Sequence, residues 1–256
     1  MSYFWRKRVR RMFYFAVLFS LLVWSMLATG VDFRQLLGLG STWSFIAGQW
    51  FPPQWDVLQE ALKQSVLTLQ IAFVGTTFGL LFALPFSFVA ARNTPLPKAV
   101  HGMVRTFLSF LRSVPEIVWG LILVPTIGLG PFGGVLAIML HNIGVLGKLV
   151  AEMIEASDKE PQQAIIATGG NRLHVLGLAI LPDIIPHIFS QYFYRMEVAT
   201  RTSLVLGFIG AGGLGNMLFI DFKVFAYQAV AVEVFVIMLL VILIDAIGGF
   251  VRKRML

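Results

Sequence analysis

Long apolar stretches alternate with short polar ones along the chain. Residues 12–28 and 64–91 carry no charged side chain, and residues 184–206 and 225–250 are mostly apolar. A helix needs about 20 apolar residues to cross the hydrocarbon core of a bilayer. The pattern therefore predicts a membrane-spanning helix in each of these four stretches. Pro85 is expected to kink or end the second helix, because proline removes a backbone donor from a helix interior.

Two further spans are expected between the second span and the last two. Residues 117–147 are uncharged, but Pro125 and the glycine-rich segment 128–134 interrupt them, and alone they are too short for two spans. Residues 106–116 before this stretch and 148–151 after it supply the missing turns. The expected fold class is therefore an all-α integral membrane protein with six transmembrane helices.

The amino-acid composition excludes several other classes of protein. Hydrophobic residues make up 57% of the chain and charged residues only 13%, whereas soluble domains carry about 25% charged residues. Because the chain has too few polar groups to cover a globular surface, it is expected to lie in a lipid bilayer. The chain has no cysteine, which excludes disulfides and thiol chemistry. The net charge of +7 is explained by membrane topology, and nucleic acid is not an expected partner.

The basic residues predict the orientation of the spans. Residues 1–11 and 251–256 contain basic side chains and no acidic one, namely Arg6, Lys7, Arg8, Arg10, Arg11, Arg252, Lys253 and Arg254. Because cytoplasmic segments are enriched in lysine and arginine, both termini are expected in the cytosol, which agrees with six spans. The expected organisation is one six-span domain over 12–250 between two basic ends. A cleaved signal peptide is an alternative interpretation of the basic start and the apolar run after it.

A polar interruption over 151–182, here called the elbow, lies between the fourth and fifth spans. Four of the chain's 13 acidic residues fall in its first ten positions, and the count of spans places it in the cytosol. The segment predicts two short helices around Gly169 and Gly170, because glycine adopts the left-handed backbone that ends a helix. A structured loop is the simplest interpretation, and a docking helix for a cytosolic partner is the more specific one.

Capping signals predict the limits of these two helices. Ser157 and Glu160 fit a capping box at the start of the first helix. Asn171 is suited to cap a second helix over 172–181, which Pro182 would end.

The elbow resembles the EAA loop of permease subunits of binding-protein-dependent ABC importers. That pattern is Glu-Ala-Ala, three residues, Gly, nine residues and Ile-x-Leu-Pro. Ala164, Gly169, Leu181 and Pro182 match it at the expected spacing, whereas Gln163 stands in place of the glutamate.

Motifs elsewhere are similar to the phosphonate-type permease subunit of these importers, and the similarity covers residues 50–250. They are RSVPE at 112–116, GLGPFGGVLA at 128–137, HNIGVLGKLVAE at 141–152 and YRMEVATRTSLVLGFIGAGGLG at 194–215. The resemblance implies the type I (MetI-like) permease fold in a bacterial inner membrane. It also implies a second copy of the chain, two ATP-binding subunits and an extracytoplasmic solute-binding protein as partners. The implied cargo is a phosphonate or a related anion such as phosphite.

The resemblance also implies that a helix over 156–169 couples the spans to the ATPase. The expected coupling residues are Ala156, Glu160, Gln163, Ala164, Thr168, Gly169, Gly170 and Pro182. ATP and magnesium would be bound by the partner, so this chain is expected to have no cofactor and no enzymatic activity. It has neither a Walker lysine motif nor a nucleophile–base arrangement, and its four histidines lack metal-ligand spacing.

Charged residues inside the predicted spans are candidates for a substrate path or gate. Glu197 and Arg201 are four residues apart and can pair, and Arg112 and Glu116 have the same spacing. Such groups are expected to face the bundle interior or water, either as a polar path for an anion or as structural ion pairs. The candidates are Arg112, Glu116, Arg195, Glu197, Arg201, Ser203, Gly212 and Gly213.

Two acidic residues of the last span and the glycine patterns complete the set of candidates. Glu233 and Asp245 are expected to seek basic partners such as Arg195 or Arg201. Residues 210–215 predict an irregular turn rather than a dinucleotide site, because they join spans, and a re-entrant loop is the alternative form of this turn. The segment 128–133 is likewise not expected to be a dinucleotide site. Gly75 and Gly79 form a small-xxx-small pattern that suits close helix packing.

Two other functions stay open from the residues alone. One is an ABC permease for another small anion or an organic solute. The other is a secondary transporter that uses Glu197, Glu233 and Asp245 as ion or proton sites, which inverted repeats would favour.

Overall fold

The computed structural model describes the backbone of residues 2–255 and the side chains in that range except 2–4, 6, 35–37, 39 and 255. Arg6, one of the basic residues used to predict topology, therefore lies outside the described side chains. The chain divides into two units, Met1–Gln49 and Trp50–Leu256. All regular elements within the described backbone are helical.

The first unit is built from helices that bury almost nothing. It contains α1 (Ser2–Ala28), a 3-10 helix η1 (Phe33–Gly38) and α2 (Leu39–Gln49). The segment Lys7–Ala28 is long and apolar enough to cross a membrane, and none of its most apolar window is buried against other protein. The first predicted span is therefore confirmed as an apolar helix. A helix that is apolar all round needs lipid or another protein around it.

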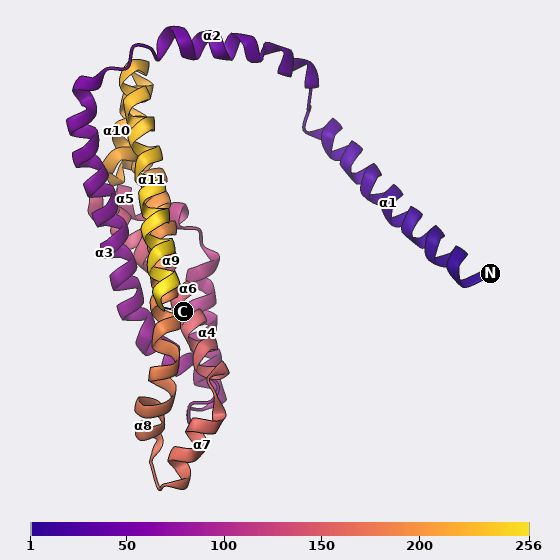
Figure 1. Ribbon diagram of the computed structural model, residues 1–256, viewed down its shortest axis with the longest axis vertical. Helices are drawn as coiled ribbons and strands as arrows, with labels where there is room; N and C mark the ends of the chain where they lie inside the picture. The colour runs from indigo at the N-terminus through magenta and orange to yellow at the C-terminus, as the bar shows by residue number, and fades with distance from the viewer. Residues whose placement is uncertain (1, 256) are drawn as a thin grey trace. The chain divides into compact units, whose positions relative to one another are not determined.

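The second unit is a bundle of long helices with shorter ones at both ends (Figure 1). Its elements are η2 (Trp55–Val57), α3 (Leu58–Ala90), α4 (Lys98–Ser113), α5 (Glu116–Ile127), α6 (Pro131–Ala156), α7 (Lys159–Ala167), α8 (Arg172–Val175), η3 (Leu176–Ile180), α9 (Leu181–Leu206), η4 (Gly207–Ala211), α10 (Gly213–Lys223) and α11 (Tyr227–Met255). Of these, η3 and η4 are π-helical turns. α7 and α8 lie at one end of the bundle, and α10 lies toward the other (Figure 1).

Five of the six predicted spans are continuous helices, and the third is broken. The helices α4 and α5 pass the length and hydropathy test only as a pair, bent by 83°. Val114, at the break, has an extended backbone with φ −86° and ψ 117°. The cause is local: a residue that precedes proline is pushed out of the helical region, and Pro115 follows. Pro85, by contrast, lies inside α3, which continues to Ala90, so it is not a helix end.

Small residues let α3 and α6 pack closely. A Cβ on Gly75 would come within 2.8 Å of the Ile138 side chain, and one on Gly79 within 2.7 Å of the Asn142 Cβ. Both positions are buried, as are Ala72 and Ala83 on the same helix. The predicted packing face at these two glycines is confirmed, and α3 together with α6 forms the centre of the unit.

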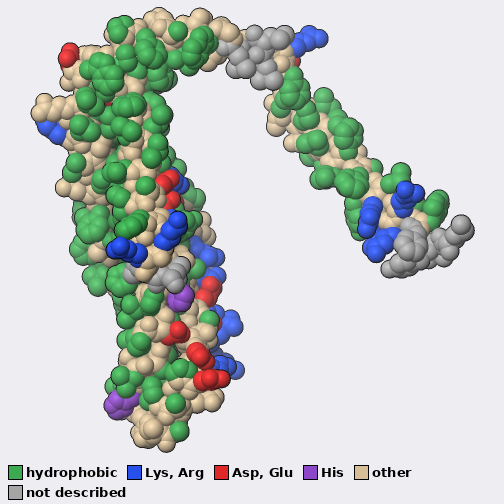
Figure 2. Space-filling model, in the orientation of Figure 1, with side chains coloured by type: hydrophobic (Ala, Val, Ile, Leu, Met, Phe, Trp, Pro, Cys, Tyr) green, Lys and Arg blue, Asp and Glu red, His purple; other side chains and the backbone are tan. Residues whose placement is uncertain are grey.

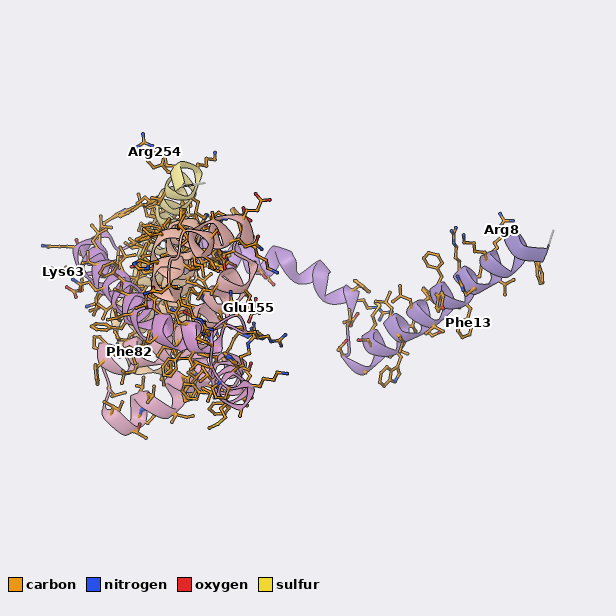
Figure 3. The ribbon with its side chains drawn as sticks, turned by 90° about the horizontal axis from the view of Figure 1, so that it is seen from below. Arg8, Phe13, Lys63, Phe82, Glu155 and Arg254 are labelled. Atoms are coloured by element: carbon orange, nitrogen blue, oxygen red, sulfur yellow. The ribbon has the colours of Figure 1, made fainter. Side chains whose placement is uncertain are left out.

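Large apolar side chains cover the outside of the bundle. Phe82 on α3 is 46% exposed and Leu243 on α11 is 55% exposed. Figure 2 shows hydrophobic side chains over the long helices, with charged side chains gathered toward the end that carries α7. Phe82 and Lys63 both lie at the edge of the bundle when it is viewed along its length (Figure 3). Such a surface is stable in lipid but not in water.

Candidate functional site

The first helix of the elbow, α7, starts from a different cap than the sequence pattern predicts. Asp158 is the N-cap, and its Oδ1 accepts a hydrogen bond from the backbone N–H of Glu160 at 3.0 Å. The Ser157 hydroxyl instead donates to the Ile154 carbonyl at 2.9 Å, at the end of α6. The predicted capping box from Ser157 to Glu160 is therefore wrong. Aspartate takes the same role as serine because its carboxylate is also a good acceptor for orphan N–H groups.

The helix is also shorter than expected at both ends. The prediction placed it over 156–169, whereas α7 is Lys159–Ala167. Ala156 is the last residue of α6, so this predicted coupling residue belongs to a membrane helix rather than to the elbow helix. Thr168 is the C-cap of α7, and its hydroxyl donates to the Ile165 carbonyl at 2.9 Å.

Two glycines close α7 in the manner that the sequence predicts. Gly169 has φ +85°, a left-handed conformation that favours glycine. Its N–H donates to the Ile166 carbonyl at 3.0 Å, and the Gly170 N–H donates to the Ile165 carbonyl at 2.9 Å. These two bonds form a Schellman motif. A Cβ on Gly170 would lie 2.5 Å from the Ile165 side chain, so both glycines are required by this turn.

The second helix of the elbow starts where it is expected and ends differently. Asn171 accepts a hydrogen bond from the His174 N–H at 3.0 Å, and its own N–H donates to His174 Nδ1 at 3.2 Å, which is a complete capping box. However, Pro182 does not end a helix over 172–181. The regular helix α8 stops at Val175, and Pro182 lies in the first turn of α9. Proline suits a first turn because that N–H has no partner in the helix.

The elbow helices expose a mixed polar and apolar surface. α7 has no buried residue, and Glu160, Gln163 and Ala164 are all exposed. Two large apolar side chains point to the outside, Ile166 at 60% and Leu173 at 76% exposure. The predicted coupling residues Glu160, Gln163 and Ala164 thus lie together with Ile166 on one short exposed helix.

A groove of about 460 Å³ separates α7 from the ends of α3 and α6. Gln163 and Ile166 line one side, and Arg92 and Glu155 line the other. Glu155 is fixed there by Arg105, whose guanidinium lies 2.9 Å from it. Its carboxylate also accepts a hydrogen bond from the Arg92 backbone N–H at 2.7 Å. The base of the elbow is therefore joined to α4 and to the end of α3 by charged groups.

A second set of polar residues lies inside the bundle and is called here the buried network. Its members come from four helices and are Thr76, Glu116, His141, Asn142 and Arg195. Arg195 donates to Asn142 Oδ1 at 2.8 Å and to Glu116 Oε1 at 3.1 Å. Asn142 donates to the Thr76 hydroxyl at 3.2 Å, and His141 Nε2 lies 3.3 Å from Glu116. The network ties α5 to α3, α6 and α9.

The expected pair between Arg112 and Glu116 does not form. Glu116 is paired with Arg195 and His141 instead. The reason is the break at Val114, which places the two residues on different helices, so four-residue spacing no longer brings them together. Asn142 and Thr76 are members that the sequence reasoning missed. The available signal was an amide and a hydroxyl inside otherwise apolar spans.

A third set of charges joins α9 to α11 and is called here the ion chain: Glu197, Arg201, Asp245 and Arg252. The predicted pair of Glu197 with Arg201 is confirmed at 3.2 Å. Arg201 also donates to both oxygens of Asp245, at 2.6 and 2.7 Å, and Arg252 lies 2.9 Å from Glu197. Glu197 is buried, whereas the side chains of Arg201 and Asp245 are 48% and 43% exposed. The expectation of a basic partner is thus confirmed for Asp245 but wrong for Glu233, whose carboxylate oxygens are buried without a hydrogen-bond partner among the described residues.

The glycine-rich segments meet near the far end of the bundle. Gly210, Gly212 and Gly213 have φ of 94°, 78° and 73°, so the chain between α9 and α10 is irregular, as the sequence predicts. The Gly130 N–H donates to the Gly210 carbonyl at 2.9 Å, which joins this turn to the α5–α6 turn. A Cβ on Gly213 would lie 2.6 Å from the Thr68 hydroxyl. Another candidate, Ser203, is buried in α9, and its hydroxyl has no partner in the described part of the chain.

A metal centre finds no support in the described residues. No group of three or more histidine, cysteine, aspartate or glutamate side chains among them is placed to hold a metal ion. The candidate site is therefore a set of polar connections between helices and one exposed elbow.

Comparisons with known proteins agree with this geometry. Residues 75–256 match the family described as "Binding-protein-dependent transport system inner membrane component". The phosphite transport system permease protein PtxC of Stutzerimonas stutzeri is 39% identical over 82% of this chain and 76% of its own length. The putative phosphite transport system permease protein HtxC of the same organism is 36% identical over 98% of this chain and 90% of its own length.

The fold agrees with a solved transporter of the same architecture. A chain of the inward-facing MetNI methionine ABC transporter matches with a TM-score of 0.67 and 18% identity, over 79% of this chain and 99% of that one. The expected MetI-like permease fold and the resemblance to importer permeases are confirmed, and an ion-coupled secondary transporter is not favoured. This chain belongs to the family of multi-pass inner membrane components of binding-protein-dependent transport systems.

Proposed function

We propose that this chain is the permease subunit of an ATP-driven importer for phosphite or a related phosphonate anion. The assignment of the cargo rests on the similarity to two phosphite transport permeases, which covers most of this chain and most of each relative. The proposed assembly contains two copies of the chain, two ATP-binding subunits and an extracytoplasmic solute-binding protein. ATP and magnesium belong to the ATP-binding subunits, and both termini of this chain face the cytoplasm.

The elbow is the proposed docking site for the ATP-binding subunit. Ile166 and Leu173 expose apolar area that a partner's groove would cover, and Ala164 allows close approach. The Schellman turn at Gly169 and the Asn171 cap hold the helices in one shape, so a displacement of α7 is passed on rather than absorbed. The residues proposed to act here are Glu160, Gln163, Ala164, Thr168, Gly169 and Gly170.

The connection from the elbow to the spans gives the proposed mechanism. α7 follows α6 closely in the chain, and the groove between them is lined by Glu155 of α6, which pairs with Arg105 of α4. Closure of the ATPase dimer would pull α7, and α5, α6 and α9 would move as one body because the buried network joins them through Glu116 and Arg195. The Arg105–Glu155 pair would make α4 follow α6. The spans would then pass from inward-open to outward-open, and hydrolysis would restore the first state.

The ion chain is the proposed contact of the permease with the anion. Arg201 is half exposed inside a membrane helix, so it keeps part of its positive potential available to a negatively charged solute. Arg195 is less suited, because Asn142 and Glu116 already accept its hydrogen bonds. A structural role for these pairs alone is the alternative.

A surface substitution on the elbow tests the docking. Leu173→Ser should abolish co-purification of the ATP-binding subunit and transport while leaving the amount of inserted chain unchanged, since Leu173 is 76% exposed. Leu129→Ser is the matched control, because Leu129 is 83% exposed but lies between α5 and α6. If the Leu173→Ser variant still co-purified with the ATP-binding subunit and transported normally, α8 would not belong to the docking surface.

The cargo is tested separately, with the assembled transporter in proteoliposomes and its own solute-binding protein. Uptake of labelled phosphite should be competed by phosphonates, and weakly or not at all by phosphate or glycine betaine. Competition by phosphate alone would mean that the cargo is phosphate, and the assignment of the chain to an importer would still stand. Uptake without ATP would contradict the assignment itself.

A further inference from the structure

Glu233 lies near the start of α11 and has no hydrogen-bond partner among the described residues. Its side chain on α11 has an exposed fraction of 0%, and both carboxylate oxygens lack a hydrogen-bond donor among the described residues. Its sequence neighbours Val232 and Val236 pack against Ala61 and Leu214 in an apolar cluster. A carboxylate that is removed from water and receives no hydrogen bond is strongly destabilised.

A second acid lies beside Glu233. Asp221 on the adjacent helix α10 is within hydrogen-bonding reach of the Glu233 carboxyl. An ionised carboxylate has acceptors only, so two ionised groups at this distance repel each other and cannot form a hydrogen bond. A single proton between them removes one charge and supplies the missing donor.

The basic side chains of the packed helices are engaged elsewhere. Lys63 on α3 pairs with Glu60 at 3.3 Å, Lys223 on α10 lies 4.3 Å above the Phe219 ring, and Arg201 on α9 pairs with Asp245. The short helix η2 adds only an acid, Asp56. No cation on α3, α9, α10 or η2 in the described chain therefore compensates the two carboxyls.

We propose that Glu233 and Asp221 hold one proton between them, so that this carboxyl pair is a proton-binding site at the junction of α10 and α11. Glu233 is the protonated partner because it is fully buried, and its O–H donates to the Asp221 carboxylate. The pair fastens α10, which begins at Gly212 and Gly213 with their left-handed backbone, to the long helix α11. The site does not depend on which solute is carried.

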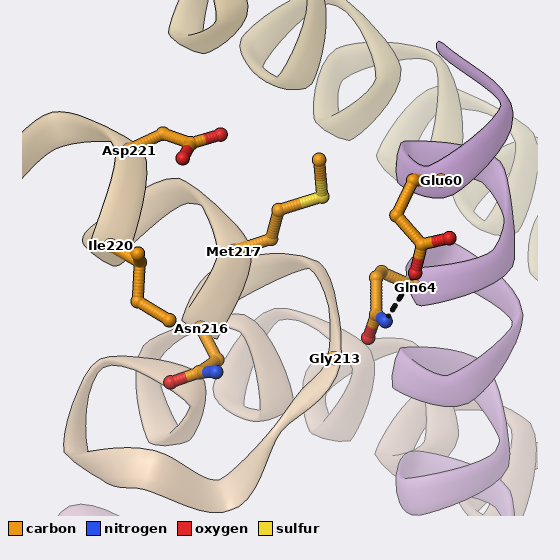
Figure 4. A pocket seen from close by; sticks show the side chains of 7 residues that line it. All are labelled: Glu60, Gln64, Gly213, Asn216, Met217, Ile220 and Asp221. Atoms are coloured by element: carbon orange, nitrogen blue, oxygen red, sulfur yellow. Dashed lines mark hydrogen bonds between the residues drawn. The ribbon is translucent and has the colours of Figure 1, made fainter. Parts of the chain in front are cut away.

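The proton has a route to and from the solvent. Asp221 lines an open cavity of about 280 Å³, together with Glu60 and Asn216 (Figure 4). Asp221 and Glu60 project into it from α10 and α3, and Glu60 is held by a hydrogen bond from Gln64 at 2.8 Å. Proton exchange therefore passes from the cavity through Asp221 to Glu233, and the occupancy of the pair follows the pH on that side of the membrane.

The direct test is infrared spectroscopy of the full transporter in lipid at neutral pH. The wild type should show the C=O stretch of a protonated carboxyl in a buried environment, and Glu233→Gln should lose that band. Asp221→Asn should keep the band at a shifted frequency, because Glu233 stays buried but its acceptor changes. Glu60→Gln, on the same cavity, should leave it unchanged. A band that persists unshifted in Glu233→Gln would overturn the proposal.

Thermal unfolding against pH gives a second readout that does not require the band to be resolved. The wild type should lose stability as the pH rises from mildly acidic to mildly basic, because over this range the folded pair keeps its proton while the same carboxyls in the unfolded chain release theirs. Glu233→Gln keeps a neutral donor at this position and should show a smaller decrease over the same range. Equal decreases in the wild type and in Glu233→Gln would contradict a shared proton.

Discussion

The buried network and the ion chain each contain an arginine of α9, yet the surroundings of these two arginines differ. Arg195 and Arg201 lie on α9, and each is held by a glutamate and a second acceptor. The Arg195 side chain is only 11% exposed, whereas that of Arg201 is 48% exposed. A sealed pair ties helices together and is expensive to break, while an open pair is weak but accessible. Accessibility, not charge, thus separates a structural arginine from a candidate solute contact.

The largest effect is expected from breaking the sealed pair. Arg195→Met leaves the Glu116 carboxylate, whose side chain is only 19% exposed, with only His141 beside it, and should cost about 3–5 kcal/mol of stability. Thermal unfolding in detergent would measure the loss. The double variant Arg195→Met with Glu116→Gln should recover most of it, because no unpaired charge remains. A double variant as unstable as the single one would show that packing, not charge, dominates.

A smaller effect should follow from pushing apart the helices that carry the network. Gly79→Leu places atoms against Asn142, since even a Cβ would lie at 2.7 Å, and should cost about 1–3 kcal/mol. Gly102→Leu is the matched control, because nothing lies within 4 Å of its Cβ position on α4. Equal melting temperatures for the two variants would mean that α3 and α6 can separate without loss.

A smaller loss is expected at the edge of the network. His141→Gln removes the contact with Glu116 at 3.3 Å and the hydrogen bond to the Val114 carbonyl at 3.0 Å, but it leaves Arg195 in place. The cost should be about 0.5–1.5 kcal/mol, measured as the unfolding midpoint in denaturant. His187→Gln, at an exposed position of α9, should be neutral. A loss as large as that of Arg195→Met would place His141 at the centre of the network.

The smallest change in stability should come from the open pair. Arg201→Gln should cost about 0–1 kcal/mol, because its pair with Asp245 is half exposed. If the ion chain contacts the anion, uptake by the assembled transporter should nevertheless fall, and Arg201→Lys should restore part of it. Unchanged uptake at unchanged stability would leave the ion chain without a role in transport.

Much of the fold was predictable because lipid imposes simple rules. Apolar length identified five continuous spans, and glycine spacing identified the end of α7 at Gly169. The prediction of a continuous third span was wrong, because the backbone restriction that Pro115 imposes on Val114 outweighed the continuous apolar pattern. That break then redirected Glu116 from Arg112 to Arg195, so one local error produced a wrong ion pair.

The polar partners were less predictable than the spans. Four-residue spacing correctly paired Glu197 with Arg201, because both lie on one helix. It gave no information on Asn142, which reaches Arg195 across the bundle from α6. Contacts between helices depend on the rotation of each helix about its axis, and hydropathy alone does not determine that rotation.

The exposed apolar side chains of the elbow bear on how cells control the amount of this subunit. Ile166 and Leu173 are 60% and 76% exposed, so a copy without the proposed ATP-binding subunit presents apolar surface to water. Such a surface is a signal that chaperones and membrane proteases detect, and assembly hides it. The abundance of the permease would then be limited by the supply of its partner, and an excess of either gene product would not yield extra transporters.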